Sequence, residues 1–288
     1  MCDLLLAEVR ILRLRRLHPD LGVEIIDFDV ANGRSPEDVA ALRDTLDEHE
    51  LLLFRGDRPV SPERHLEICS WFGPCNTKGA DGTQWTYMDN AEAIGRDRLM
   101  FHSDVSYAER PMEGISLHAL ELPKTDTTTA FVSGVAAWAG LSHERQVMLA
   151  PMTARHRLGV SMVPDWPEFV ADKPVCMTHP RTGRPVLYVT EYHAERIHEL
   201  APGASDRILA ELFAHLYAPE HVYLHTWQPH DLIVWDNLAV QHARPEVSDP
   251  AHGVRKLQRV TIGGQPFEEI LAAARRREQE ERARGTAR

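Results

Sequence analysis

Short runs of β-branched and aromatic residues, each bounded by turn formers, recur along the chain and constrain its fold more than any other feature. Such runs are typical of short strands, and few helix patterns lie between them. We therefore expect a mainly β protein with peripheral helices and a double-stranded β-helix (jelly-roll) core, a double sheet that can enclose a small ligand. The expected strands are Leu51–Phe54, Ile115–Leu120, Val186–Val189, Val222–Thr226, Leu232–Trp235 and Gln258–Ile262.

Helix-start signals flank the first of these strands. The sequence Ser-Pro-Glu at 35–37 supplies an N-cap, a first-turn proline and a first-turn acid. The same sequence recurs at 61–63, and there Gly73 is a candidate C-terminal cap. We expect a helix after each signal. A further helix is expected behind Ser205 as N-cap, because apolar residues follow on one face at Ile208, Leu209, Leu212 and Leu216.

The domain organisation follows from length and from the absence of linkers in the sequence. The 288 residues are near the size at which single cores stop growing, and no Gly/Ser-rich or Pro-rich segment divides them. We expect one domain over residues 1–288, with a substrate-covering insertion at roughly 135–220 between the jelly-roll strands. A charged helix is expected at 267–284, as a solvated surface or an interface of a homo-oligomer rather than as part of a catalytic site.

Charge and cysteine usage narrow the classes of partner. Asp and Glu outnumber Lys and Arg by 43 to 32, a balance of −11 that repels nucleic acid and anionic membrane surfaces. The apolar stretch at 1–7 is soon followed by charged residues, so it is too short for a signal or a membrane span, and we expect a cytoplasmic protein. The four cysteines lack CxxC spacing, which indicates free thiols rather than a disulfide framework.

A candidate metal site begins at His102-Ser103-Asp104. On a strand, side chains two residues apart project from the same face, so the imidazole and the carboxylate could contact one ion. His242 is the preferred third ligand because it follows the strand Leu232–Trp235 and a turn. Two histidines and one carboxylate leave three adjacent positions open on an octahedral iron. The same ligands could hold a catalytic zinc, and a lone HxD pair is weak evidence in a chain with 16 histidines.

A buried cation near the metal would favour iron over zinc. A 2-oxo acid that chelates a metal leaves its distal carboxylate pointing into the barrel, where an unpaired charge is costly and a guanidinium can bind it in bidentate geometry. Arg255 and Arg259 lie on or just before the strand Gln258–Ile262 and could face the metal. Considered alone, they are equally well interpreted as surface arginines.

The ordered motifs resemble those of the taurine dioxygenase and 2,4-dichlorophenoxyacetate dioxygenase family of iron(II)- and 2-oxoglutarate-dependent oxygenases. The resemblance extends over most of the chain, and its motifs occur in the family's order. They are Leu51–Phe54, Trp71-Phe72-Gly73, Phe101-His102-Ser103-Asp104-Val105, Thr178-His179-Pro180, Thr182-Gly183-Arg184, Leu187-Tyr188-Val189, Trp227-Gln228-Pro229, Trp235-Asp236-Asn237, Gln241-His242 and Arg255–Ile262.

The resemblance implies roles for individual residues. His102, Asp104 and His242 match the family's iron ligands, and these three are the expected catalytic centre. Arg255 matches the arginine that binds the distal carboxylate of 2-oxoglutarate, and Thr129 the threonine that hydrogen-bonds this cosubstrate. His179 is expected to be structural. The implied cofactors are Fe(II), 2-oxoglutarate and dioxygen. Because Asp104 keeps the carboxylate that halogenating relatives replace, hydroxylation is favoured over halogenation.

The oxidised substrate is expected to be a small anionic molecule. Arg259 matches a family arginine that approaches an anionic group of the substrate, and Lys78 and Arg98 are further candidate substrate-binding cations. Two other classes of function remain open: a zinc-dependent hydrolase on the same three ligands, and a jelly-roll binding protein without turnover.

Overall fold

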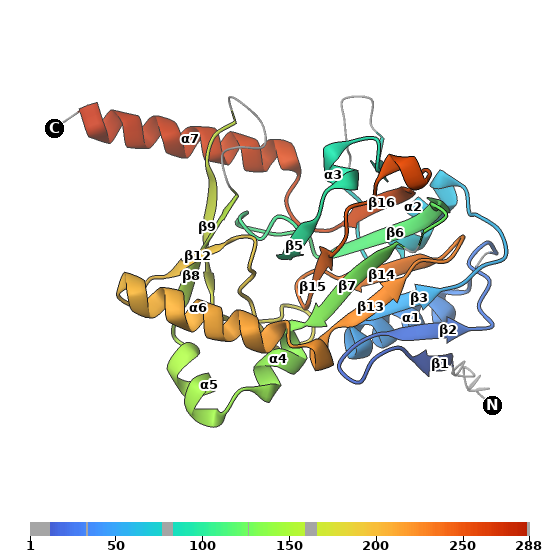
Figure 1. Cartoon of the computed structure of the whole chain (residues 1–288), viewed down its shortest axis with the longest axis horizontal. Helices are drawn as coiled ribbons and strands as arrows, with labels where there is room; N and C mark the ends of the chain where they lie inside the picture. Colours follow the sequence, from blue (N-terminus) through green and yellow to red (C-terminus); the bar gives the residue numbers. More distant parts are fainter. Residues whose placement is uncertain (1–11, 33, 77–82, 126, 159–165, 287–288) are drawn as a thin grey trace, which may run out of the picture.

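Two sheets form the core of the computed structural model, which describes residues 12–32, 34–76, 83–125, 127–158 and 166–286 (Figure 1). The larger sheet has, in spatial order, β1 Arg13–Arg16, β2 Val23–Ile26, β3 Leu51–Phe54, β14 Leu232–Asp236, β6 Gly114–Glu121, β16 Lys256–Ile262 and β4 Thr86–Asp89. The smaller sheet has β13 Tyr223–Thr226, β7 Thr128–Ser133, β15 Val240–Arg244 and β5 Leu99–His102. The predicted mainly β, jelly-roll class is confirmed, and its strands lie close to the expected ranges.

Strand β3 shows why a short apolar run forms a central strand here. Leu51 and Leu53 pack between the two sheets, in a cluster that includes Phe131 of the smaller sheet. Leu52 and Phe54 point to the opposite face, which is covered by the helices α1 Pro36–His49 and α2 Pro62–Ser70. All four side chains are buried because successive residues of a strand project to opposite faces and both faces are covered.

The predicted starts of α1 and α2 are confirmed. The Ser35 hydroxyl accepts a hydrogen bond from the backbone N–H of Asp38 in a capping box, and the Ser61 hydroxyl accepts one from the backbone N–H of Arg64 at the start of α2. The expected cap at Gly73 is wrong. Helix α2 ends earlier, with Trp71 as its right-handed C-cap. Gly73 instead allows close packing, since a Cβ there would lie 2.9 Å from Cγ2 of Ile262.

The segment between β7 and β13 forms a separate layer beside the sheets. Its elements are α4 Gly134–Gly140, α5 His143–Leu149, β8 Thr153–Leu158, β9 Phe169–Pro174, β10 Cys176–Thr178, β11 Pro185–Leu187, β12 Ala194–Ile197, α6 Pro202–Leu216 and η2 Pro219–His221. The sequence predicted Ser205 as the N-cap of α6, and this prediction is wrong. Ser205 lies inside that helix, is buried, and its hydroxyl accepts a hydrogen bond from the backbone N–H of Ile197 at 2.8 Å, a tertiary partner that no local pattern indicates.

Helix α7 Phe267–Thr286 ends the chain and extends beyond β9 in Figure 1. Its Ile270 and Ala274 are buried in a cluster with Phe169 of β9, so the first turns of this charged helix belong to the core. The remaining short helices are α3 Ala93–Arg96 and η3 Pro250–His252. Within the described ranges, no helix is both long enough and apolar enough to cross a membrane.

Candidate active site

The smaller sheet brings the two candidate histidine ligands together. Strand β15 lies between β7 and β5, and its register places His242 directly opposite His102. The two imidazole centroids are 4.2 Å apart. The backbone pairing of two antiparallel strands therefore fixes the distance between residues that are far apart in the sequence.

Asp104 reaches the histidines by a different route from the one expected. Strand β5 ends at His102, so Asp104 does not lie on the same strand face. It begins a turn in which Val105 has a positive φ of 61° and accepts a backbone hydrogen bond from Ala108 at 2.9 Å. The turn brings Oδ1 of Asp104 to 3.2 Å from Nε2 of His102. The prediction of a shared strand face was wrong, although the two side chains do meet.

The three side chains fit a divalent metal. Each offers one ligand atom, and these atoms all lie within 4.8 Å of one another. Nδ1 of His102 contacts the carbonyl oxygen of Met100 at 2.8 Å, so Nδ1 carries the proton and the lone pair of Nε2 faces Asp104. Burial and the nearby His102 keep the pKa of His242 well below its usual value, so this ring is neutral. Two imidazoles and a carboxylate suit iron(II) with open coordination positions.

Arg259 balances the charge of Asp104. Its guanidinium forms an ion pair with the Asp104 carboxylate, and both side chains are largely buried. Burial alone would raise the pKa of Asp104, but the nearby charge of Arg259 outweighs this effect and holds the pKa well below the usual range. The carboxylate is therefore ionised and available to a cation at neutral pH.

A cavity of about 590 Å³ opens beside these residues and is lined by the two predicted cosubstrate residues, Arg255 and Thr129. Nε of Arg255 donates to the Thr127 hydroxyl at 2.9 Å, and the Thr129 hydroxyl accepts from Nε1 of Trp227 at 2.9 Å. Burial and the nearby Arg244 lower the pKa of Arg255 to about 10, which leaves it charged at neutral pH. A buried guanidinium in the same cavity as the triad can bind a carboxylate.

The predicted substrate-binding cations have different outcomes. Arg259 lines the cavity. Arg98 is exposed and does not line it, and Lys78 lies outside the described residues. Arg244 also lines the cavity and is buried, and sequence reasoning missed it. A signal for it existed, because Arg244 lies two residues after His242 on β15 and so projects to the same face.

The rest of the cavity wall is mostly apolar and comes from separate parts of the chain. Val105 and Met112 follow β5, Leu158 and Trp166 come from the layer between β7 and β13, and Phe267 begins α7. Tyr192 and His193 of that same layer also line the cavity. A volume of this size is ordinary for a small-molecule site and is large enough for a cosubstrate beside a second molecule.

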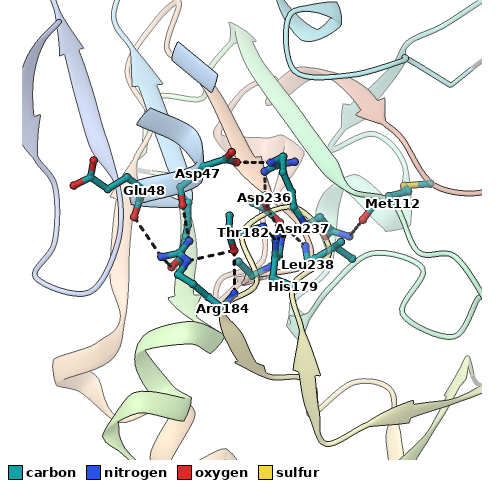
Figure 2. Close-up of polar contacts among 12 residues, drawn as sticks. Asp47, Glu48, Met112, His179, Thr182, Arg184, Asp236, Asn237 and Leu238 are labelled. Carbon is teal, nitrogen blue, oxygen red and sulfur yellow. Dashed lines mark hydrogen bonds and ion pairs between the residues drawn. The ribbon is translucent and has the colours of Figure 1, made fainter. Parts of the chain in front are cut away.

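Figure 2 shows how the end of β14 is anchored next to the site. The buried carboxylate of Asp236 lies 3.0 Å from Nε2 of His179 and accepts a hydrogen bond from Arg181 at 2.6 Å. Nδ1 of His179 accepts from the backbone N–H of Thr182 at 3.1 Å, so the proton is on Nε2, which faces the Asp236 carboxylate. His179 thus has a structural contact and is not part of the candidate metal group, as expected.

The chain is similar to known proteins over most of its length. Pentalenolactone F synthase of Streptomyces arenae is 30% identical over 255 residues, covering 77% of this chain and 85% of the relative. The alpha-ketoglutarate-dependent 2,4-dichlorophenoxyacetate dioxygenase of Cupriavidus pinatubonensis is 26% identical over 278 residues, 85% of this chain and 95% of that protein. A taurine dioxygenase structure from Burkholderia xenovorans superposes with a TM-score of 0.76 at 23% identity, covering 88% of this chain and 90% of the other.

Fold and site together define a class, the 2-oxoglutarate-dependent non-haem iron dioxygenases. The family model described as taurine catabolism dioxygenase TauD, TfdA family matches residues 13–261. The chain belongs to this family.

Proposed function

We propose that this protein oxidises a C–H bond of a small anionic molecule, by hydroxylation, with release of succinate and CO2. In this proposal His102, Asp104 and His242 hold Fe(II), and Arg255 and Thr129 bind 2-oxoglutarate. The presence of a buried, charged Arg255 in the same cavity as the triad carries the proposal. A hydrolytic zinc site has no need of such a carboxylate anchor.

The metal, when bound with 2-oxoglutarate and dioxygen, supplies the oxidising power, and the protein supplies placement. The hydrogen bond from His102 to the Met100 carbonyl keeps Nε2 free for the metal. The hydrogen bond from Arg255 to Thr127 orients the guanidinium, so its remaining N–H groups can receive the distal carboxylate. Trp227 takes up one lone pair of the Thr129 hydroxyl, which leaves the hydroxyl proton available for the cosubstrate.

Arg259 and the apolar wall support the proposed substrate class. Arg259 faces the cavity next to Asp104 and can pair with an anionic group held close to the metal. Trp166, Leu158 and Phe267 suit an apolar carbon skeleton. The insertion at roughly 135–220 would cover the substrate, because Leu158, Trp166 and Tyr192 all come from it. Relatives named for pentalenolactone F and for 2,4-dichlorophenoxyacetate are consistent with an anionic substrate that has an apolar body.

An anaerobic spectroscopic titration tests this function. Fe(II) and 2-oxoglutarate added to the protein should give a visible charge-transfer band. Arg255→Ala should weaken 2-oxoglutarate binding at least about tenfold while Fe(II) binding is kept, because a buried carboxylate loses its charged partner. Arg98→Ala is the matched control and should leave the band and its titration unchanged, since Arg98 is exposed and outside the cavity.

Three results would contradict the proposal. Absence of the band in folded, metal-loaded protein would favour the zinc hydrolase, and a band without succinate formation across a wide range of small carboxylates and sulfonates would favour a binding protein. Unchanged 2-oxoglutarate affinity in Arg255→Ala would show that another cation binds the distal carboxylate.

A further inference from the structure

Asn237 contacts the backbone of Asp104 through both the oxygen and the nitrogen of its carboxamide. The residue is fully buried just after β14. Its Oδ1 accepts from the backbone N–H of Asp104 at 2.9 Å, and Nδ2 donates to the Asp104 carbonyl at 3.0 Å. Nδ2 also donates to the carbonyl of Met112 at 2.8 Å, a contact visible in Figure 2. Both N–H groups and the oxygen of the carboxamide are therefore used.

The backbone of Asp104 depends on these contacts because no strand holds it. Strand β5 ends two residues earlier, and the next residue, Val105, has a positive φ of 61°. That conformation is unfavourable for a β-branched side chain and persists only where the surroundings fix it. Asn237 forms with Asp104 the pair of hydrogen bonds that a neighbouring strand would otherwise form.

Asn90 holds the backbone of Arg255 with a similar pair of hydrogen bonds. It is buried, and its Oδ1 accepts from the Arg255 backbone N–H at 3.0 Å. Its own backbone N–H donates to the Arg255 carbonyl at 3.1 Å, and Nδ2 donates to the Gly253 carbonyl at 3.0 Å. Arg255 also lies outside a strand, one residue before β16 begins. The two residues proposed to bind the metal and the distal carboxylate are thus each held by a buried asparagine.

We propose that Asn237 and Asn90 are positioning residues that act separately, Asn237 on the metal end of the site through Asp104 and Asn90 on the cosubstrate end through Arg255. This inference rests on the proposed function, since it assumes that Asp104 binds the metal and Arg255 the cosubstrate. Neither asparagine lines the cavity, so both act through the backbone of a site residue.

Mn(II) and N-oxalylglycine, an analogue of 2-oxoglutarate, test the inference without turnover. Asn237→Ala should weaken Mn(II) binding by about 10- to 100-fold, the range found when residues that orient metal ligands are removed. At saturating Mn(II), its affinity for N-oxalylglycine should be unchanged. Asn90→Ala should show the reverse, with unchanged Mn(II) affinity and N-oxalylglycine binding at least about tenfold weaker. Each variant is the matched control of the other, because both remove one buried carboxamide.

A merely structural role would lower both affinities together, in step with the free energy of unfolding measured in urea, and that result would overturn the inference. If Asn237→Ala does not fold, Asn237→Ser is used, and unchanged Mn(II) affinity in that variant also overturns it. Asp104→Ala separates the two levels of proposal. If Asp104→Ala binds Mn(II) as the wild type does, the proposed site is wrong. If Asp104→Ala loses Mn(II) binding but Asn237→Ala keeps it, the proposed metal site is correct and the proposed role of Asn237 is wrong.

Discussion

Glu50 combines burial, charge and an unusual backbone conformation at a single residue. It is the left-handed C-cap of α1, with φ 67°, and its N–H donates to the carbonyl of Leu46. The buried carboxylate accepts from the Ser133 hydroxyl at 2.6 Å and lies 3.1 Å from the Arg184 guanidinium. Burial raises the pKa of Glu50 to about 7, and the Ser133 hydrogen bond and the Arg184 charge only partly offset this effect.

Replacing Glu50 should change how stability depends on pH. Because its pKa is higher in the folded state than its unperturbed value of 4.5, this carboxyl contributes stability at low pH that is lost as pH rises through about 7. The unfolding free energy of Glu50→Gln minus that of the wild type should therefore be about 2 kcal/mol larger at pH 8 than at pH 5.5. Urea unfolding at both pH values measures this difference.

The control for this experiment lies on the same helix. Glu48 has an exposed side chain, so Glu48→Gln should show the same pH dependence as wild type. If Glu50→Gln and Glu48→Gln behave alike, the ion pair with Arg184 fully stabilises the Glu50 carboxylate and its pKa is not raised.

Where the sequence carries a motif, it predicted which residues form the site. It did not predict how those residues are arranged in space. The sequence indicated His102, Asp104 and His242 as one group, and the structure brings them together. The turn at Asp104 could not be predicted, because it depends on Asn237, which comes from a distant strand end. Asn90 carries no sequence signal at all, since a single asparagine outside a motif is usually a turn residue.

At the scale of elements, local patterns predicted strands and helix starts but not their partners. The run Leu51–Phe54 is short, apolar and bounded by turn formers, so a strand was the simplest interpretation. Helix α6 begins earlier than predicted because Pro202 occupies its first turn. Ser205 instead accepts a hydrogen bond from Ile197 of β12. Capping patterns are informative where the serine bonds to its own helix, as Ser35 does, and misleading where it bonds elsewhere.

The contact between the end of β14 and the segment after β10 should be important for stability. Asp236→Asn keeps the shape of the side chain but removes the charge that pairs with Arg181 and faces Nε2 of His179. Arg181 is partly exposed and keeps its ion pair with Asp47, but the buried His179 loses its charged neighbour, so we expect a loss of about 1 to 3 kcal/mol of unfolding free energy. Chemical denaturation measures it.

Asp47 provides the comparison, because it pairs with the same Arg181 but its side chain is partly exposed. Asp47→Asn should cost at most about 1 kcal/mol. Similar losses in both variants would mean that the burial of Asp236 adds nothing to the contact.

At the scale of the whole molecule, the cavity forms where the two sheets, the layer between β7 and β13 and helix α7 meet. The charged sequence of α7 predicted a solvated or interface helix, yet Phe267 and Glu268 line the cavity and Ile270 is buried. This packing could not be predicted, because it depends on contacts with Phe169 and Val105, which lie in other parts of the chain. Sequence patterns indicate which face of a helix is apolar, but not which distant surface covers it.

Because the cavity forms only when these parts assemble, ligands should stabilise the whole fold. A ligand that binds only the native state adds about 2.7 kcal/mol at a concentration one hundred times its Kd. For a chain of this size, that free energy raises Tm by roughly 4 to 5 °C. Mn(II) should give such a shift in thermal unfolding, N-oxalylglycine a further one only when Mn(II) is present, and EDTA should reverse both.

Asp104→Ala determines whether the stabilising metal lies at the proposed site. This variant lacks the carboxylate that faces His102, so Mn(II) should produce no shift in Tm, and N-oxalylglycine should then have no metal to chelate. The variant also leaves Arg259 without its ion-pair partner, so its Tm without metal should lie below that of the wild type. If Mn(II) raises the Tm of Asp104→Ala as much as that of the wild type, the stabilising metal does not bind to the Asp104 carboxylate and lies elsewhere.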